Sequence, residues 1–371
     1  MRDLESLIKE VNKKFDEEII TVGLIEKNTG KIPFSSPRLN YMLYGGIPRG
    51  RIIEFAGDEG SGKTTTALDL TANSQRVFEQ EHIDILQELD TQKSSNKQKQ
   101  NEYNRIFARG EKRVLYMDCE NTLDEDWAKL LGVNLDKLIL IKPMSQTAEQ
   151  LFQIILDFIE TDAIGLVVID SLGVMLSSQA YEKTMEEKTY GGIAMALTLF
   201  SKKAELLCNK HDCILVGINQ MREDMNSQYG GLTTTGGKAW KHNCSLRLLF
   251  QKGSYVDDNG NELKRSAENP AGNLVMVSVT KTKVCRPDRR VGFYTLKYLE
   301  GIDYISDTID VAIKQGVVIQ AGSWFTVLDK ATGEILSYDN MDLKIQGKNN
   351  LIALAKEHSE VLNIIQGMLN E

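Results

Sequence analysis

The chain has 371 residues, 42% of them hydrophobic, which suits a large core domain with smaller attachments. No stretch is long enough to span a bilayer, and the first residues lack the basic start and apolar run of a signal peptide. We therefore expect a soluble, cytoplasmic protein with no membrane partner. The formal charge of −8 argues against a protein that coats nucleic acid through bulk charge, so such a partner would need a local surface.

Near the N-terminus, apolar residues recur at helical spacing, and Asp3 is a suitable helix cap. The members of this apolar stripe are Leu4, Leu7, Ile8, Val11 and Phe15. A short amphipathic helix has no core of its own, so we expect it to dock on another surface.

Apolar strand candidates alternate with helical stretches through the middle of the chain. The strand candidates are residues 51–56, 114–118, 138–141, 165–170 and 213–218, and the helices include residues 147–160 and 193–210. Continuous apolar strands that alternate with helices are typical of a parallel sheet covered on both faces. The pattern predicts an α/β fold with a mainly parallel central sheet.

The second half of the chain has a different pattern. Alternating strands are expected over residues 245–299, with a hairpin at residues 257–260. From about residue 305 we expect a small α+β domain: a helix around Ile309, a strand pair at 324–328 and 334–338, and two helices ending at Leu369. The predicted domains are thus an N-terminal segment at residues 1–35, a core at 36–304 and a small C-terminal domain at 305–371.

One segment of the core, about 78–112, is an unusually long crossover. Its middle, residues 88–103, is nearly free of apolar residues and cannot bury itself, so we expect a solvated helix or a mobile loop. A plain insertion is a better interpretation than a functional arm.

Residues 57–64 read Gly-Asp-Glu-Gly-Ser-Gly-Lys-Thr, between an apolar strand and a helix-favouring run. This is a P-loop, whose backbone N–H groups and following helix dipole bind the phosphates of a nucleoside triphosphate. We expect Lys63 to reach the β- and γ-phosphates and Thr64 to ligate Mg²⁺. The predicted nucleotide-binding residues are Gly57, Asp58, Glu59, Gly60, Ser61, Gly62, Lys63, Thr64 and Thr65.

Polar residues follow three further strand candidates. Asp170 ends a buried strand, where a carboxylate can hold Mg²⁺, although strands also end in Asp for capping alone. Glu120 is placed to activate a water as general base, or is a plain surface residue. Gln220 can bond the γ-phosphate and sense its loss.

Residues 221–237, here called loop 2, are rich in amide, hydroxyl and glycine groups. The segment could settle on a sugar-phosphate backbone, with Arg222 in its first turn, Gly236 and Gly237 N–H groups for phosphates, and Tyr229 for a base face. A plain surface loop is the alternative. On a later strand, Lys281 and Lys283 project from one face, which suits a phosphate between them or a solvated edge.

Taken together in this order, these segments resemble the bacterial RecA recombinases. The resemblance covers residues 45–54, 57–64, 118–124, 131–133, 167–171, 218–220, 233–237, 281–283, 300–303 and 321–324. It implies a RecA-type P-loop ATPase core with an N-terminal docking helix and a small C-terminal domain. It implies a location in the cytoplasm, or in the host cytoplasm if a phage encodes the chain.

The resemblance also implies roles for single residues. Glu120 would be the general base and Gln220 the sensor that couples ATP to loop 2, while Asp124 and Trp127 would contact the adenine. Lys281 and Lys283 would reach the ATP of a neighbouring subunit and neutralise charge in phosphoryl transfer. The N-terminal helix would dock on the adjacent core and build a helical filament.

By the same resemblance, two loops would meet DNA: loop 1, about 178–191, and loop 2. Tyr190 and Lys202 join Gly236 and Gly237 as candidate DNA contacts. The chain departs from the family pattern in these loops, where it carries the acidic residues Glu182, Glu186, Glu187, Glu223 and Asp224.

The sequence therefore predicts an ATP- and Mg²⁺-dependent protein that polymerises on single-stranded DNA and exchanges strands with homologous double-stranded DNA, hydrolysing ATP as it does so. One alternative is a hexameric helicase with a RecA-type core, which gives no reason for loop 2 and the lysine pair together. The other is an ATP-gated DNA-coating or signalling scaffold, against which Glu120 counts. The lack of a zinc-type Cys cluster in the sequence speaks against the RadA-like branch.

Overall fold

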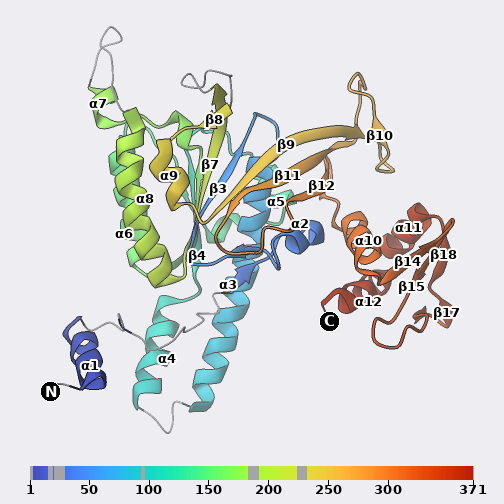
Figure 1. Ribbon diagram of the computed structural model, residues 1–371, viewed down its shortest axis with the longest axis horizontal. Helices are drawn as coiled ribbons and strands as arrows, with labels where there is room; N and C mark the ends of the chain where they lie inside the picture. Colours follow the sequence, from blue (N-terminus) through green and yellow to red (C-terminus); the bar gives the residue numbers. More distant parts are fainter. Residues whose placement is uncertain are drawn as a thin grey trace. The chain divides into compact units, whose positions relative to one another are not determined.

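The computed structural model describes residues 3–15, 20, 30–92, 97–182, 192–223 and 232–370 (Figure 1). Within these ranges, no helix combines the length and the apolar character needed to cross a membrane. The chain divides into two compact units, Met1–Gly30 and Lys31–Glu371.

The first unit contains the predicted N-terminal helix, α1 (Leu4–Phe15). In its apolar stripe Leu4 and Leu7 are 70% and 42% exposed, whereas Ile8 and Val11 are half-buried. Asn12 Nδ2 donates to the Ile20 carbonyl oxygen and Asn12 Oδ1 accepts from the Ile20 N–H, both at 2.8 Å, so Ile20 lies beside the helix. The side chain of Phe15 lies outside the described part.

The second unit is built around one large sheet, with the strand order β13-β12-β11-β9-β3-β7-β6-β4-β5. The parallel part, which confirms the predicted mainly parallel sheet, consists of β3 (Ile52–Gly57), β4 (Arg113–Asp118), β5 (Leu138–Ile141), β6 (Ile164–Asp170), β7 (Ile214–Glu223) and β9 (Leu246–Val256). Antiparallel strands extend it, namely β11 (Gly272–Thr282), β12 (Val291–Lys297) and β13 (Gly301–Ile302), with β10 (Glu262–Leu263) beside β9 and β8 (Leu232–Thr234) beside β7.

Helices cover both faces of this sheet (Figure 1). One face packs against α2 (Pro37–Met42), α3 (Lys63–Gln92) and α5 (Glu125–Leu130), and the other against α6 (Ala148–Glu160), α8 (Gly192–His211) and α9 (Gly237–Asn243). Strand β6 is buried throughout because Leu166 and Val168 face the first layer and Val167 and Ile169 the second. The predicted α/β class is therefore correct.

Register brings the polar strand ends together. Gly57 at the end of β3 lies opposite Gln220 on β7, and Asp118 at the end of β4 lies opposite Asp170 on β6. Because these strands run parallel, all four residues share the carboxyl edge of the sheet, where ligands bind in open α/β folds.

The long crossover at residues 78–112 is helical where the structure describes it. Helix α3 runs on to Gln92, and α4 (Lys97–Arg109) follows after residues 93–96, which lie outside the described part. Of the two alternatives, a solvated helix is thus closer than a mobile loop. The described residues of 88–103 are exposed or half-buried apart from Leu89, which is buried.

The predicted hairpin forms, whereas the predicted loop 2 is partly strand. The hairpin at residues 257–260 joins β9 to β10, and the Asp257 carboxylate accepts bonds from the backbone N–H groups of Asn259 and Asn261. The two described ends of loop 2 pair with each other as strands, because β7 continues to Glu223 and pairs with β8. Short elements complete the core: β1 (Lys31–Ile32), β2 (Ile47–Pro48), the 3₁₀ turns η1 (Leu135–Lys137) and η2 (Leu172–Val174), and α7 (Ser178–Tyr181).

The C-terminal region has its own apolar cluster, formed by α10 (Tyr304–Gln315), β14 (Val318–Ala321), β15 (Trp324–Val327), β18 (Lys344–Gln346), α11 (Lys348–Glu357) and α12 (Ser359–Asn370). The predicted pairing of 324–328 with 334–338 occurs only near its turn, through the Leu328–Ile335 bridge and the bond from the Leu336 N–H to the Val327 carbonyl oxygen. Strand β15 pairs instead with β14 and β18, which buries Phe325 and Val327. Two further short strands, β16 (Ser337–Tyr338) and β17 (Met341–Asp342), pair with each other.

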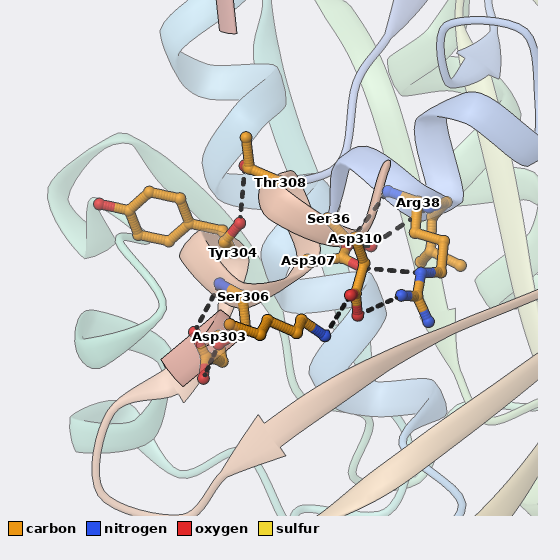
Figure 2. A network of polar contacts seen from close by, with 10 residues as sticks. Ser36, Arg38, Asp303, Tyr304, Ser306, Asp307, Thr308 and Asp310 are labelled. Carbon is orange, nitrogen blue, oxygen red and sulfur yellow. Dashed lines mark hydrogen bonds and ion pairs between the residues drawn. The ribbon is translucent and has the colours of Figure 1, made fainter. Parts of the chain in front are cut away.

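Ion pairs join α10 to α2 (Figure 2). Arg38 Nε lies 3.2 Å from Asp307 Oδ1, and Arg38 Nη2 lies 2.5 Å from Asp310 Oδ2. The Ser36 hydroxyl, which caps α2, also donates to Asp307. We call these residues the joint. The domain limit near residue 305 stays a prediction.

Candidate nucleotide-binding site

At two positions of the P-loop, no residue other than glycine fits. A Cβ at Gly57 would lie 2.4 Å from the Phe250 carbonyl oxygen, and one at Gly62, where φ is +95°, would lie 3.0 Å from Val275 Cγ2. Tight packing beneath the loop thus fixes its path. A cavity of about 390 Å³ adjoins the loop at residues 60–65.

Lys63, the first residue of α3, reaches back over the loop. Its ammonium donates to the Asp58 carbonyl oxygen at 2.6 Å and lies 3.4 Å from Ser61 Oγ. Burial lowers the Lys63 pKa, while the nearby carboxylates of Asp170 and Glu120 act in the opposite direction. The ammonium is therefore held by neutral oxygens and can exchange them for phosphate oxygens.

Asp170 lies beside the predicted magnesium ligand Thr64. Its Oδ2 atom accepts hydrogen bonds from Thr64 Oγ1 and from the Tyr116 hydroxyl, both at 2.8 Å. Burial raises the Asp170 pKa, and these two bonds oppose the rise. In the described ranges, no group of three or more His, Cys, Asp or Glu side chains could hold a metal by itself. Thr64 and Asp170 fit Mg²⁺ that arrives with phosphate oxygens and water as its other ligands.

Glu120 and Gln220 meet although Glu120 follows β4 and Gln220 lies on β7. Gln220 Nε2 donates to Glu120 Oε1 at 3.4 Å, and the Ser171 hydroxyl donates to the same oxygen. The structure thus brings the predicted base and the predicted sensor into contact at the sheet edge, beside Asp170.

The predicted adenine contacts, Asp124 and Trp127, have structural contacts of their own. Asp124 caps α5, accepting bonds from the backbone N–H groups of Asp126 and Trp127 at 3.0 Å, and Trp127 packs partly buried against the core. Neither residue lines the P-loop cavity, so their contact with adenine stays a prediction.

Sequence reasoning missed the opposite wall of the cavity. It includes Leu296 and the polar residues Lys252, Asn273 and Tyr298, with the Tyr298 hydroxyl donating to Asn273 Oδ1 at 2.9 Å. These residues come from β9, β11 and the end of β12, so only the antiparallel register could have revealed them.

Lys281 and Lys283 do lie together, but neither lines the P-loop cavity of its own chain. Lys281 Nζ donates to the carbonyl oxygens of Lys241 and His242 at 2.7 Å, and Lys283 Nζ donates to that of His242 at 3.0 Å. Burial, and then repulsion from Lys283, lowers the Lys281 pKa. The two cations thus stabilise the carbonyl end of α9, the helix that begins at Gly237.

The candidate DNA contacts are spread over several elements. Gly236 and Gly237 have φ of +100° and +71°, and a Cβ at Gly236 would lie 2.4 Å from Leu197 Cδ2. Arg222 donates to the Gly173 carbonyl oxygen at 3.1 Å, and Lys202 is exposed on α8. Tyr190 and Tyr229 lie outside the described residues, as do Glu186, Glu187 and Asp224.

A buried polar network, also missed, joins the P-loop strand to loop 2. Glu54 on β3 is fully buried and accepts bonds from Asn219 Nδ2 and Trp240 Nε1, both at 3.0 Å, and from Arg247 Nε. Asn219 Nδ2 also donates to the Thr235 carbonyl oxygen at 2.8 Å. Asn219 directly precedes Gln220 and Thr235 directly precedes Gly236, so one network contacts both predicted ends of the coupling.

A glycine loop after a central parallel strand, with carboxylates on the neighbouring strand ends, defines a P-loop nucleotide-binding protein of the α/β class. The family model described as "RecA N-terminal domain" matches residues 2–101 and 104–303. The chain therefore belongs to the RecA family, whose members are ATPases of DNA recombination and repair.

Curated relatives agree with this assignment. The chain is 32% identical over 346 residues to "Protein RecA" of Fusobacterium nucleatum, an alignment that covers 93% of this chain and 77% of the relative. It is 33% identical over 290 residues to "Protein RecA" of Ureaplasma parvum, covering 78% and 74%. With "Protein RecA" of Chloroherpeton thalassium the identity is 29% over 375 residues, covering 99% and 87%.

Proposed function

We propose that this protein is an ATP-dependent recombinase of the cytoplasm. It polymerises on single-stranded DNA, pairs that strand with a homologous duplex and exchanges strands, with DNA-stimulated ATP hydrolysis. The observation that carries the proposal is the meeting of Thr64 with Asp170 and of Glu120 with Gln220 at one sheet edge, beside the P-loop.

Each residue at this edge has a role that fits its position. The P-loop N–H groups and Lys63 would hold the phosphates of ATP, and Thr64 with Asp170 would hold Mg²⁺. ATP supplies a phosphoryl group that can be transferred to water. Glu120 accepts the proton of the attacking water, and Gln220, in contact with Glu120, registers the state of the site. Asp124 and Trp127 contact the adenine.

The site is shared between subunits. Lys281 and Lys283 serve the nucleotide of a neighbour, which supplies the anion that a pair of adjacent cations favours. In the single chain they contact the carbonyl end of α9 instead. The exposed stripe of α1, which includes Leu4 and Leu7, supports docking on an adjacent core. Ile8, Val11 and Phe15 complete the stripe.

DNA binding is assigned to the two loops. Gly236 and Gly237 offer peptide N–H groups to backbone phosphates, and Arg222 and Lys202 offer charge. The aromatic rings of Tyr190 and Tyr229 would stack on bases. The Glu54 network supports coupling, since it contacts residues next to both Gln220 and Gly236.

The test is ATP hydrolysis with and without single-stranded DNA, combined with strand exchange between a circular single strand and a linear duplex. DNA should stimulate hydrolysis, and Lys63→Ala should abolish it, whereas Lys330→Ala on the exposed surface should change little. A rate indifferent to DNA would favour the scaffold alternative.

The shared site is tested by mixing. Lys63→Ala lacks phosphate binding and Lys281→Ala/Lys283→Ala lacks the cations in trans, so each should be inactive alone. A mixture should recover part of the activity, because some interfaces then combine an intact P-loop with intact lysines. No recovery, or protein that stays monomeric with Mg²⁺, ATP and oligonucleotide, would contradict the proposal.

A further inference from the structure

A second cavity, of about 610 Å³, lies away from the P-loop, between α2, the start of β12 and α10. It shares no lining residue with the cavity beside the P-loop. Four of its lining residues are cations, namely Arg38, Arg289, Arg290 and Lys314. In a chain with a net charge of −8, such a concentration of positive charge indicates an anionic ligand.

The two carboxylates of this cavity do not neutralise it. Asp310 is engaged by Arg38 and by Lys348. Asp288, which accepts the Tyr44 hydroxyl at 2.6 Å, offsets only one of the three other cations. Within the described ranges, neither Arg290 nor Lys314 forms an ion pair. Two cations therefore remain for a ligand.

Arg289 is held rigidly in the wall of the cavity. Its guanidinium lies 3.8 Å from the ring centroid of Tyr41 and 4.0 Å from that of Tyr44, and Nη1 donates to the Tyr41 carbonyl oxygen at 2.8 Å. A guanidinium fixed in this way loses little conformational entropy when it binds, and its remaining donors match the geometry of a phosphate.

A neighbouring cavity, of about 490 Å³, has a different chemistry. It shares Tyr41, Arg289 and Val311 with the first cavity, and its wall carries the amide side chains of Gln315 and Gln366. Amides beside an aromatic ring can hydrogen-bond the edge of a nucleobase, whereas the basic cavity can hold its phosphate.

We propose that the basic cavity binds the phosphate of a nucleotide unit, with the base in the amide-lined cavity beside it. The unit is a free nucleotide or part of a polynucleotide strand, since both present the same phosphate. This site is separate from the P-loop and from loops 1 and 2.

The test compares two double variants that lose the same charge. Arg290→Gln/Lys314→Gln removes the unpaired cations of the cavity, and Lys264→Gln/Arg265→Gln removes an exposed pair outside it. Binding of a labelled 30-base-pair duplex and of a labelled 30-nucleotide single strand is measured over a salt series. Binding of a fluorescent ADP analogue is measured in the Lys63→Ala background, which silences the P-loop.

If a strand occupies the cavity, the cavity variant should lower the slope of log K against log[salt] by about 2 for duplex and about 1.5 for single strand. The control pair should leave the slope nearly unchanged. If a free nucleotide occupies it, the slope stays and binding of the ADP analogue falls by about tenfold, the cost of one charge-assisted hydrogen bond.

Two results would overturn the proposal: equal effects of the two double variants, or no loss of any ligand. A cavity variant that changes only the sedimentation of the protein would also overturn it, because an acidic segment of a second copy would then be the occupant. Failure of the proposed recombinase function is distinguishable, since it appears as a lack of DNA stimulation in the unsubstituted protein.

Discussion

The sheet edge and the joint each contain a buried aspartate, but the two are neutralised differently. At the joint, Asp307 accepts a hydroxyl from Ser36 and is paired with Arg38 at 3.2 Å. At the sheet edge, Asp170 accepts hydroxyls from Thr64 and Tyr116, and no cation is paired with it in the described part of the chain.

Lys63 sharpens this contrast. Its ammonium lies in the same neighbourhood as Asp170 but donates to a carbonyl and a hydroxyl oxygen. The joint is thus electrostatically complete within the chain, whereas the sheet edge keeps a cation and carboxylates unpaired for a ligand. Incomplete pairing among buried charges, more than their mere presence, marks the functional site.

The largest effect is expected at the sheet edge. Glu120→Gln keeps the shape and the contact with Gln220 but removes the base, so ATP hydrolysis should fall by about 10² to 10⁴. Nucleotide binding and the free energy of unfolding should hardly change, because Glu120 is in no ion pair that the structure records. Single-turnover hydrolysis and urea unfolding provide the two measurements.

A matched control for this change is Glu125→Gln, in the first turn of α5, where the carboxylate is exposed. It should leave hydrolysis unaltered. Unchanged hydrolysis in Glu120→Gln would remove Glu120 from the mechanism and weaken the distinction between the two regions.

At the joint, we expect a substitution to lower stability and to leave hydrolysis intact. Arg38→Met keeps the packing against Phe293, whose ring centroid lies 3.7 Å from Arg38 Cζ, but leaves Asp307 buried without its cation. The free energy of unfolding should fall on the order of 3 kcal/mol, the cost of breaking a buried pair from one side. Nucleotide hydrolysis measured well below the unfolding transition should be retained.

The comparison for this variant is Arg109→Met. Arg109 lies 2.6 Å from Asp162, but both side chains are more exposed than those of the joint. Its loss should cost no more than about 1 kcal/mol. Equal losses for the two arginines would mean that burial does not decide the strength of the joint.

The sheet edge could be predicted from sequence because its signals are local. The P-loop is a contiguous motif, Asp170 ends the apolar strand β6, and Gln220 follows the apolar part of β7. Parallel topology then places their side chains at one edge without further information. The same logic found the lysine pair Lys281 and Lys283, although not its contact with α9.

The joint and the far wall of the P-loop cavity could not be predicted in this way. Arg38 and Asp307 are separated by 269 positions, and neither belongs to a motif. Asn273 and Tyr298 meet through antiparallel register, which sequence alone leaves free. The strand pairing predicted after residue 324 forms only near its turn for the same reason, because β15 could pair with more than one neighbour.

The smallest expected effect is a pH dependence of the joint. Burial raises the pKa of Asp307 from 3.8 to about 6, although Ser36 and Arg38 oppose the rise. The folded protein therefore holds a proton that the unfolded chain has lost between about pH 4 and pH 6. The stabilisation from this group is fully present below pH 4 and is lost as the pH rises through about 6.

Asp307→Asn should remove that part of the pH dependence. A shift of about 2 units corresponds to a ceiling of about 3 kcal/mol, and we expect roughly half of it because solvent and relaxation weaken buried charge effects. Urea unfolding at pH 4 and pH 7 measures the change. Asp69, whose pKa burial also raises to about 6, keeps its own contribution in the variant, so the slope should flatten only in part. A slope identical to that of the unsubstituted protein would mean that Arg38 already holds Asp307 ionised throughout, and the joint would then match a salt bridge at the surface.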